Sequence, residues 1–149
     1  MPLQISHTAS CQAPVDVAFA YVSDYRNVGQ WLFGVSKFEP VGEQTYGLGA
    51  IFDASLHLGL PIHTRIRVSE FEEGALMAFD SVKGFKVTSI WRFTALDDAT
   101  TSIDAEVDLT LPFGPAGKAM GKVIQPVLKT AITHSSKELA HHIEATARS

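Results

Sequence analysis

The chain has 149 residues, of which 46% are hydrophobic, which is enough for one domain with a buried core over residues 1–149. Its formal net charge of −4 argues against nucleic-acid binding, and no apolar run reaches the roughly 18 residues that an integral membrane span needs. The single cysteine, Cys11, excludes an internal disulfide, and no signal peptide precedes the first strand pattern, so we expect a cytoplasmic protein.

The N-terminal part predicts a strand followed by two short helices. Residues 3–12 alternate between apolar and polar side chains, which is typical of a strand. Ala13-Pro14 opens a helix, because proline is favoured in the first turn, and Asp24 is a suitable cap for a second helix. Tyr21 and Trp31 lie on these helices, where they could gate a pocket or simply pack in the core.

The middle of the chain predicts six further strands in a meander. Their patterns cover residues 35–41, 51–58, 62–71, 75–82, 85–96 and 101–111. Tight turns join each strand to the next, which makes the sheet antiparallel. In the last strand Asp104, Glu106 and Asp108 alternate with apolar residues, so one face of the sheet is expected to be wet.

One hairpin has a predicted register. With Gly59-Leu60-Pro61 as a three-residue turn, Leu56 lies opposite Thr64 and Asp53 lies opposite Arg67. This pairing sorts the apolar residues to one face and sets opposite charges across from each other on the other face.

No metal or cofactor site is expected, and no catalytic constellation can be recognised. The predicted register places His57 opposite His63, but they lie on the polar face and no third metal ligand is evident. The sequence contains no Ser/His/Asp triad, CxxC, P-loop or dinucleotide-binding glycine motif.

The last quarter predicts one long amphipathic helix from Pro115 to about residue 147. Its apolar stripe has a period of 3.6 residues and consists of Met120, Val123, Ile124, Val127, Leu128, Ala131, Ile132, Ser135, Leu139 and Ile143. Pro126 removes one backbone hydrogen bond and should bend the helix. Because so long a stripe needs a broad partner, we expect the helix to cross the concave face of the sheet.

Several short motifs occur in order along the chain: Ala13-Pro14, Asp16, Phe19, Val22, Asp24, Trp31, Gly47, Gly49, Trp91-Arg92-Phe93 and Thr100-Thr101. Together with the order of elements, they resemble the START-like helix-grip (SRPBCC) superfamily, nearest its polyketide cyclase/dehydrase branch. The resemblance implies an α+β helix-grip fold: a seven-stranded curved antiparallel sheet wrapped around a long C-terminal helix, with two short helices between strands 1 and 2. It also implies an apolar cavity between sheet and helix.

The strand faces and the helix stripe assign side chains to this cavity. The candidate ligand-binding residues are Tyr21, Trp31, Phe52, Leu56, Thr64, Ile66, Val87, Ser89, Trp91, Val107, Met120 and Ile124. A mostly apolar lining with few polar groups is typical of a small-molecule site, although the same side chains could fill a solid core. Asp80 is ambiguous: a two-residue Lys83-Gly84 turn would place it in the cavity as a general acid or base. A one-residue bulge would turn it to solvent, which we favour.

Three functions are compatible with these features. We favour the binding or transport of a hydrophobic small molecule, such as a lipid or a polyketide-like compound. The alternative is a polyketide cyclase/dehydratase acting on an aromatic or polyketide substrate, and the third is a partner-binding regulatory module. Whether the protein is an enzyme, and whether it forms a homodimer, stay open.

Overall fold

The computed structural model describes residues 2–110 and 115–148, with side-chain surroundings for residues 4–110 and 122–147. The strands are β1 (Pro2–Cys11), β2 (Val35–Pro40), β3 (Ile51–His57), β4 (Pro61–Glu72), β5 (Leu76–Gly84), β6 (Lys86–Asp97) and β7 (Thr100–Thr110). The helices are α1 (Val15–Ser23), the short 3₁₀ turn η1 (Tyr25–Asn27), α2 (Val28–Trp31) and α3 (Pro115–Arg148).

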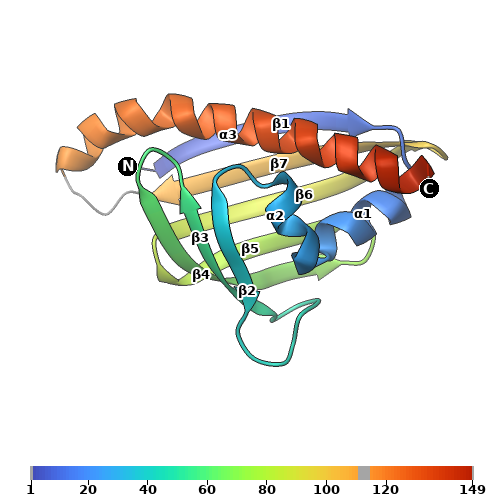
Figure 1. The fold of residues 1–149 in the computed structure, drawn as a ribbon, viewed down its shortest axis with the longest axis horizontal. Coiled ribbons are helices and arrows are strands. Elements are labelled where there is room, and N and C mark those ends of the chain that lie inside the picture. The colour runs from blue at the N-terminus through green and yellow to red at the C-terminus, as the bar shows by residue number, and fades with distance from the viewer. Residues whose placement is uncertain (1, 111–114, 149) are drawn as a thin grey trace.

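All seven strands form one antiparallel sheet in the order β1-β7-β6-β5-β4-β3-β2. The sheet curls, α3 lies across it, and α1 and α2 close one end between β1 and β2 (Figure 1). The predicted α+β helix-grip fold is therefore confirmed. The curl matters for function, because it leaves room between the sheet and the helices.

The two N-terminal helical segments are held by a cap and by an aromatic cluster. The side chain of Asp24 accepts a hydrogen bond from the backbone N–H of Arg26 at 3.0 Å, as the predicted cap requires. Phe19 of α1 is 2% exposed and meets the rings of Phe71 and Phe93 edge-on, with centroid distances of 5.5 and 5.2 Å. This contact fixes α1 against the sheet.

The helix α3 continues through Pro126 and appears as one gently arched ribbon in Figure 1. Ile124, Leu139 and Ile143 are at most 1% exposed, so the predicted stripe does face the protein. Val123 is the exception: it is 66% exposed, and its placement in the stripe was wrong. Successive residues lie about 100° apart around a helix, so a stripe centred on Ile124 leaves its neighbour on the solvent side. No helix in the described part of the chain is long and apolar enough to cross a membrane.

The hairpin between β3 and β4 has the predicted faces but different partners. Leu56 pairs with Ile62, and the predicted pairing of Leu56 with Thr64 is wrong. The reason is the turn: Pro61 is already the first residue of β4, so the turn is Leu58-Gly59-Leu60, one residue earlier than predicted, and each pairing partner shifts by two residues. Proline is tolerated at the first residue of a strand. A shift of two residues keeps each side chain on its own face.

The same shift changes the charged pairs on the outer face. Asp53 pairs with Arg65, not with Arg67, and its Oδ1 lies 2.7 Å from the Arg65 Nε. The hydrogen bond from Arg65 lowers the pKa of the Asp53 carboxyl. Either arginine satisfies the charge pattern, so the sequence alone did not distinguish the two registers.

The thiol of Cys11 predicts a pH effect on stability. Cys11 is 1% exposed, and burial, assisted by the Glu144 carboxylate, raises the pKa of its thiol from 9.0 to about 11. The unfolded chain therefore loses this proton at a lower pH than the folded protein. We expect a free energy of unfolding that declines between pH 9 and 11, measured by urea denaturation. The decline should be smaller in Cys11→Ala, and an identical slope in that variant would contradict the prediction.

Candidate ligand-binding site

The interior between the sheet, the short helices and α3 is hollow in two adjoining places. The first, which we call the Trp31 lobe, has a volume of about 100 Å³ and lies beneath η1 and α2. The second, the α3 lobe, has a volume of about 140 Å³ and lies between the sheet and the middle of α3. Both lobes are lined by Leu32, Phe38, Ile66, Phe79 and Ser89, so the two spaces adjoin.

Most of the remaining lining of each lobe is apolar. The Trp31 lobe is further lined by Val22, Ser23, Tyr25, Val28, Trp31, Thr45, Tyr46, Gly47, Phe52, Val68, Met77 and Trp91. The α3 lobe is further lined by Phe33, Ala54, Leu56, Leu58, Ile62, Thr64, Val87, Val107, Leu109, Leu128, Ala131, Ile132 and Ser135. Each lobe is smaller than the roughly 300 Å³ of typical ligand sites, and so are the two lobes together. A ligand held here would therefore have to be small and to occupy both lobes.

The structure brings nine of the twelve candidate ligand-binding residues to these lobes. They are Trp31, Phe52, Leu56, Thr64, Ile66, Val87, Ser89, Trp91 and Val107. Ile124 is buried in the core under α3 but lines neither lobe. Tyr21 also lines neither: its hydroxyl donates to Gln30 Oε1 at 2.8 Å and its ring stacks on His142. The side chain of Met120 lies outside the described residues.

Trp31 carries an unused hydrogen-bond donor. The residue is 6% exposed, and its indole Nε1 is a buried polar atom without a hydrogen-bond partner in the described part of the chain. Its ring meets that of Trp91 edge-on, with the centroids 5.4 Å apart. A buried N–H without a partner costs about 1–3 kcal/mol. A ligand oxygen in this lobe would remove that cost.

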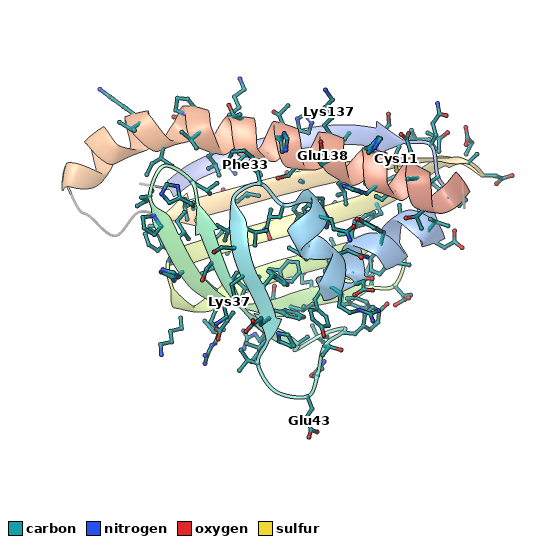
Figure 2. All side chains as sticks on the ribbon, in the orientation of Figure 1. Cys11, Phe33, Lys37, Glu43, Lys137 and Glu138 are labelled. Atoms are coloured by element: carbon teal, nitrogen blue, oxygen red, sulfur yellow. The ribbon has the colours of Figure 1, made fainter. Side chains whose placement is uncertain are left out.

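Two hydroxyls in the α3 lobe are already engaged. Thr64 Oγ1 donates to the backbone carbonyl of Phe85 at 2.9 Å. Ser135 is 1% exposed, and its Oγ accepts the backbone N–H of Phe33 at 2.8 Å. Figure 2 shows Phe33 close beneath α3. Because accepting a bond leaves a hydroxyl proton free, Ser135 can still donate to a ligand.

The two lobes hold no carboxylate, imidazole or thiol among their described lining residues. Asp80 lies on the outer face, where it pairs with Thr88 on one side and Arg67 on the other. The predicted solvent-facing orientation holds because Asp80 pairs with Thr88, one residue beyond the Val87 partner that a two-residue Lys83-Gly84 turn would give it. The titratable groups at the lobes are the phenols of Tyr25 and Tyr46.

The two histidines of the hairpin do not form a pair. His57 pairs with Pro61, and the ring Nδ1 of His63 lies 2.9 Å from Ser55 Oγ. The predicted opposition of His57 and His63 is therefore wrong, for the reason given for the register. Within residues 2–110 and 115–148, no three metal-ligating side chains gather at one place.

Sequence reasoning missed several lining residues for three different reasons. Phe79 and Phe38 lie on predicted strands, but the face of each strand depends on a turn or bulge that the alternation does not locate. Ser135 was in the predicted helix stripe and could have been assigned from that position. Tyr46 lies in the loop of residues 41–50, which has no periodic signal.

A curved sheet closed by a long helix over an apolar cavity defines a helix-grip protein. The chain belongs to the polyketide cyclase/dehydrase and lipid transport family, whose model matches residues 2–144. No curated protein sequence matches the chain significantly.

Solved structures with the same fold span nearly the whole chain. TTHA0849 from Thermus thermophilus is 16% identical with a TM-score of 0.83, and the match covers 97% of this chain and 99% of that one. A START superfamily protein from Mycobacterium smegmatis is 16% identical with a TM-score of 0.76, covering 96% and 98%. The ZhuI aromatase/cyclase from Streptomyces sp. R1128 is 14% identical with a TM-score of 0.74, covering 99% and 94%. At these identities the likeness establishes the fold alone.

Proposed function

We propose that the protein binds or carries a small, uncharged, hydrophobic molecule that bears an acceptor oxygen, held across the Trp31 and α3 lobes. The observation that carries this proposal is the buried indole N–H of Trp31, which has no partner in the described structure and belongs to a side chain that lines an apolar cavity. Burial of apolar surface, worth about 25 cal/mol per Å², supplies the affinity. The indole fixes the orientation of the ligand.

Family membership supports the proposal at a coarse level, because the family combines cyclases and dehydrases with lipid transport proteins. The cyclase alternative needs a group that moves protons at the substrate. The described lining of the lobes offers only the phenols of Tyr25 and Tyr46 for that role, so we favour binding over turnover. Cys11 is buried and unpaired, and the reducing cytoplasm remains the proposed location.

The acceptor oxygen can be tested with two ligands of matched shape. Acetylnaphthalene carries a carbonyl, and isopropylnaphthalene replaces that oxygen with a methyl group. We expect the wild-type protein to bind the ketone about tenfold more tightly, because satisfying a buried donor is worth about 1–3 kcal/mol. Isothermal titration calorimetry gives both affinities.

Variants identify the group responsible for this preference. Trp31→Phe should abolish the preference for the ketone. Trp91→Phe makes the same truncation in the same lobe and should lower the affinity for both ligands by the same factor. Equal binding of the two ligands by the wild-type protein would mean that the ligand oxygen does not reach the indole N–H, and the proposed anchor would be wrong. If neither ligand binds, the binding proposal fails.

Native mass spectrometry after incubation with a lipid and polyketide extract separates binding from turnover. A carrier releases its ligand unchanged. A product lighter than its precursor by one water would favour the cyclase/dehydratase alternative instead.

A further inference from the structure

An open cleft lies directly outside the Trp31 lobe. It has a volume of about 580 Å³ and runs between α1 and η1 on one side and the loop of residues 41–50 and the β4–β5 turn on the other. Four residues line both the cleft and the lobe: Ser23, Tyr25, Thr45 and Tyr46. The side chains of these residues therefore form the boundary between an open cleft and the apolar interior.

The side chain of Tyr46 closes one side of this boundary through a hydrogen bond and a ring contact. Its hydroxyl donates to Glu73 Oε2 on the β4–β5 turn at 2.5 Å, and its ring lies edge-on to Phe71 with the centroids 5.1 Å apart. The side chain is nevertheless 47% exposed, so water can compete for the hydroxyl. The hydroxyl also contacts the Ser23 side chain on α1, and at this exposed position water can replace both contacts.

The loop of residues 41–50 is otherwise fastened mainly at its ends. Backbone hydrogen bonds join Val41 to Ile51 at 2.8 Å and Gly49 to Val68 at 2.9 Å. Between these points the Gln44 amide donates only to carbonyls of the loop itself, those of Tyr46 and Leu48. Glu43 projects from its tip (Figure 2).

Two glycines allow this loop to change its path. Gly42 and Gly47 have φ angles of 97° and 82°, in the region that glycine adopts without strain. Both lie where an added Cβ would meet nothing within 4 Å, so packing does not hold these positions. The loop can therefore hinge at Gly42 and Gly47 once the Tyr46 side chain is released.

We propose that this cleft is the route by which a ligand reaches the Trp31 lobe, with the hydrogen bond between Tyr46 and Glu73 as the latch; the inference rests on the proposed function. The alternative route, by lifting α3, would have to expose Leu139 and Ile143, which are 1% and 0% exposed. Releasing the half-exposed Tyr46 side chain is easier than exposing two buried aliphatic side chains. The latch controls the rates of exchange and leaves the affinity nearly unchanged, because a gate affects binding and release equally.

Stopped-flow fluorescence with Prodan, a fluorescent naphthalene ketone, measures both rates. Tyr46→Phe removes only the hydroxyl, and we expect its association and dissociation rate constants to rise together by roughly threefold to tenfold. The equilibrium affinity should change by less than about twofold. Asp16→Asn is the control: it changes a polar side chain that lines the same cleft but neither lobe, and both rates should stay at wild-type values.

Glu73→Ala should raise both rates in the same direction as Tyr46→Phe, and the double variant should be no faster than Tyr46→Phe alone, because Tyr46→Phe already breaks the bond to Glu73. Unchanged rates in Tyr46→Phe, with normal Prodan binding, would overturn the latch and leave the proposed function intact. Faster release alone, with weaker affinity, would make Tyr46 a ligand contact and would also overturn it. If the wild-type protein does not bind Prodan, both proposals fail.

Discussion

Ala54→Phe should abolish the binding of Prodan while the protein remains folded. Ala54 is 4% exposed on β3 and lines the α3 lobe, whose volume is about 140 Å³. A phenyl ring at this position fills space that the ligand needs, so affinity should fall by about a hundredfold or more. Overpacking a core costs about 1–3 kcal/mol, which is less than the total stability of a typical domain. Fluorescence titration with Prodan measures the loss, and thermal denaturation confirms the fold.

The neighbouring position provides a control for this substitution. Ser55 follows Ala54 on the same strand but points to the outer face, where its Oγ contacts the ring of His63. Ser55→Phe adds a phenyl ring to the same strand without entering the cavity, and it should bind Prodan with wild-type affinity. Wild-type affinity in Ala54→Phe would show that the ligand does not occupy the α3 lobe.

The order of elements could be predicted because it depends on local periodicity. The strict alternation from Ile103 to Leu109 and the 3.6-residue stripe from Ile124 to Ile143 require a sheet face and a helix face, whatever surrounds them. The same alternation placed Thr64 and Leu56 toward the interior, and they line the α3 lobe. A register error of two residues leaves every side chain on its predicted face of the sheet, because side chains alternate with a period of two.

The hairpin register could not be predicted because two solutions satisfy the same rules. Arg65 and Arg67 are both cationic and lie on the same face, so either one can oppose Asp53. The turn decides between them, and it depends on where Pro61 enters the strand. The error at Val123 has a different origin: apolar character alone placed it in the stripe, although its position next to Ile124 turns it toward solvent.

The sequence predicts where the site lies better than it predicts the volume of the site or its free hydrogen-bonding groups. The volumes of the two lobes depend on how the rings of Phe38 and Phe79 pack between them. The indole N–H of Trp31 is unpartnered because no described acceptor lies within hydrogen-bond distance of that one nitrogen atom. Both properties depend on how side chains from distant parts of the chain pack together, and no periodic pattern in the sequence encodes that packing. A helix-grip fold therefore follows from the pattern, while its ligand must be argued from the coordinates.

Leu139→Ala should lower the free energy of unfolding by about 3 kcal/mol and the melting temperature by roughly 10 °C. Leu139 is 1% exposed and packs in the core cluster that contains Phe19 and Ile143, where its truncation leaves a cavity. It lines neither lobe. The variant should therefore lose stability without losing binding. Urea denaturation measures the lower free energy of unfolding, and the affinity for Prodan should stay unchanged at urea concentrations below the unfolding transition.

Val123→Ala is the matched control on the same helix. Because Val123 is 66% exposed, removing its methyl groups should change stability by less than about 0.5 kcal/mol. A loss in Leu139→Ala as small as in Val123→Ala would mean that the second half of α3 is not held against the sheet and α1. The access route would then have to be reconsidered, because lifting the helix would be as easy as releasing Tyr46. A large loss in Leu139→Ala alone supports the view that α3 is fixed and that the loop of residues 41–50 is the part that moves.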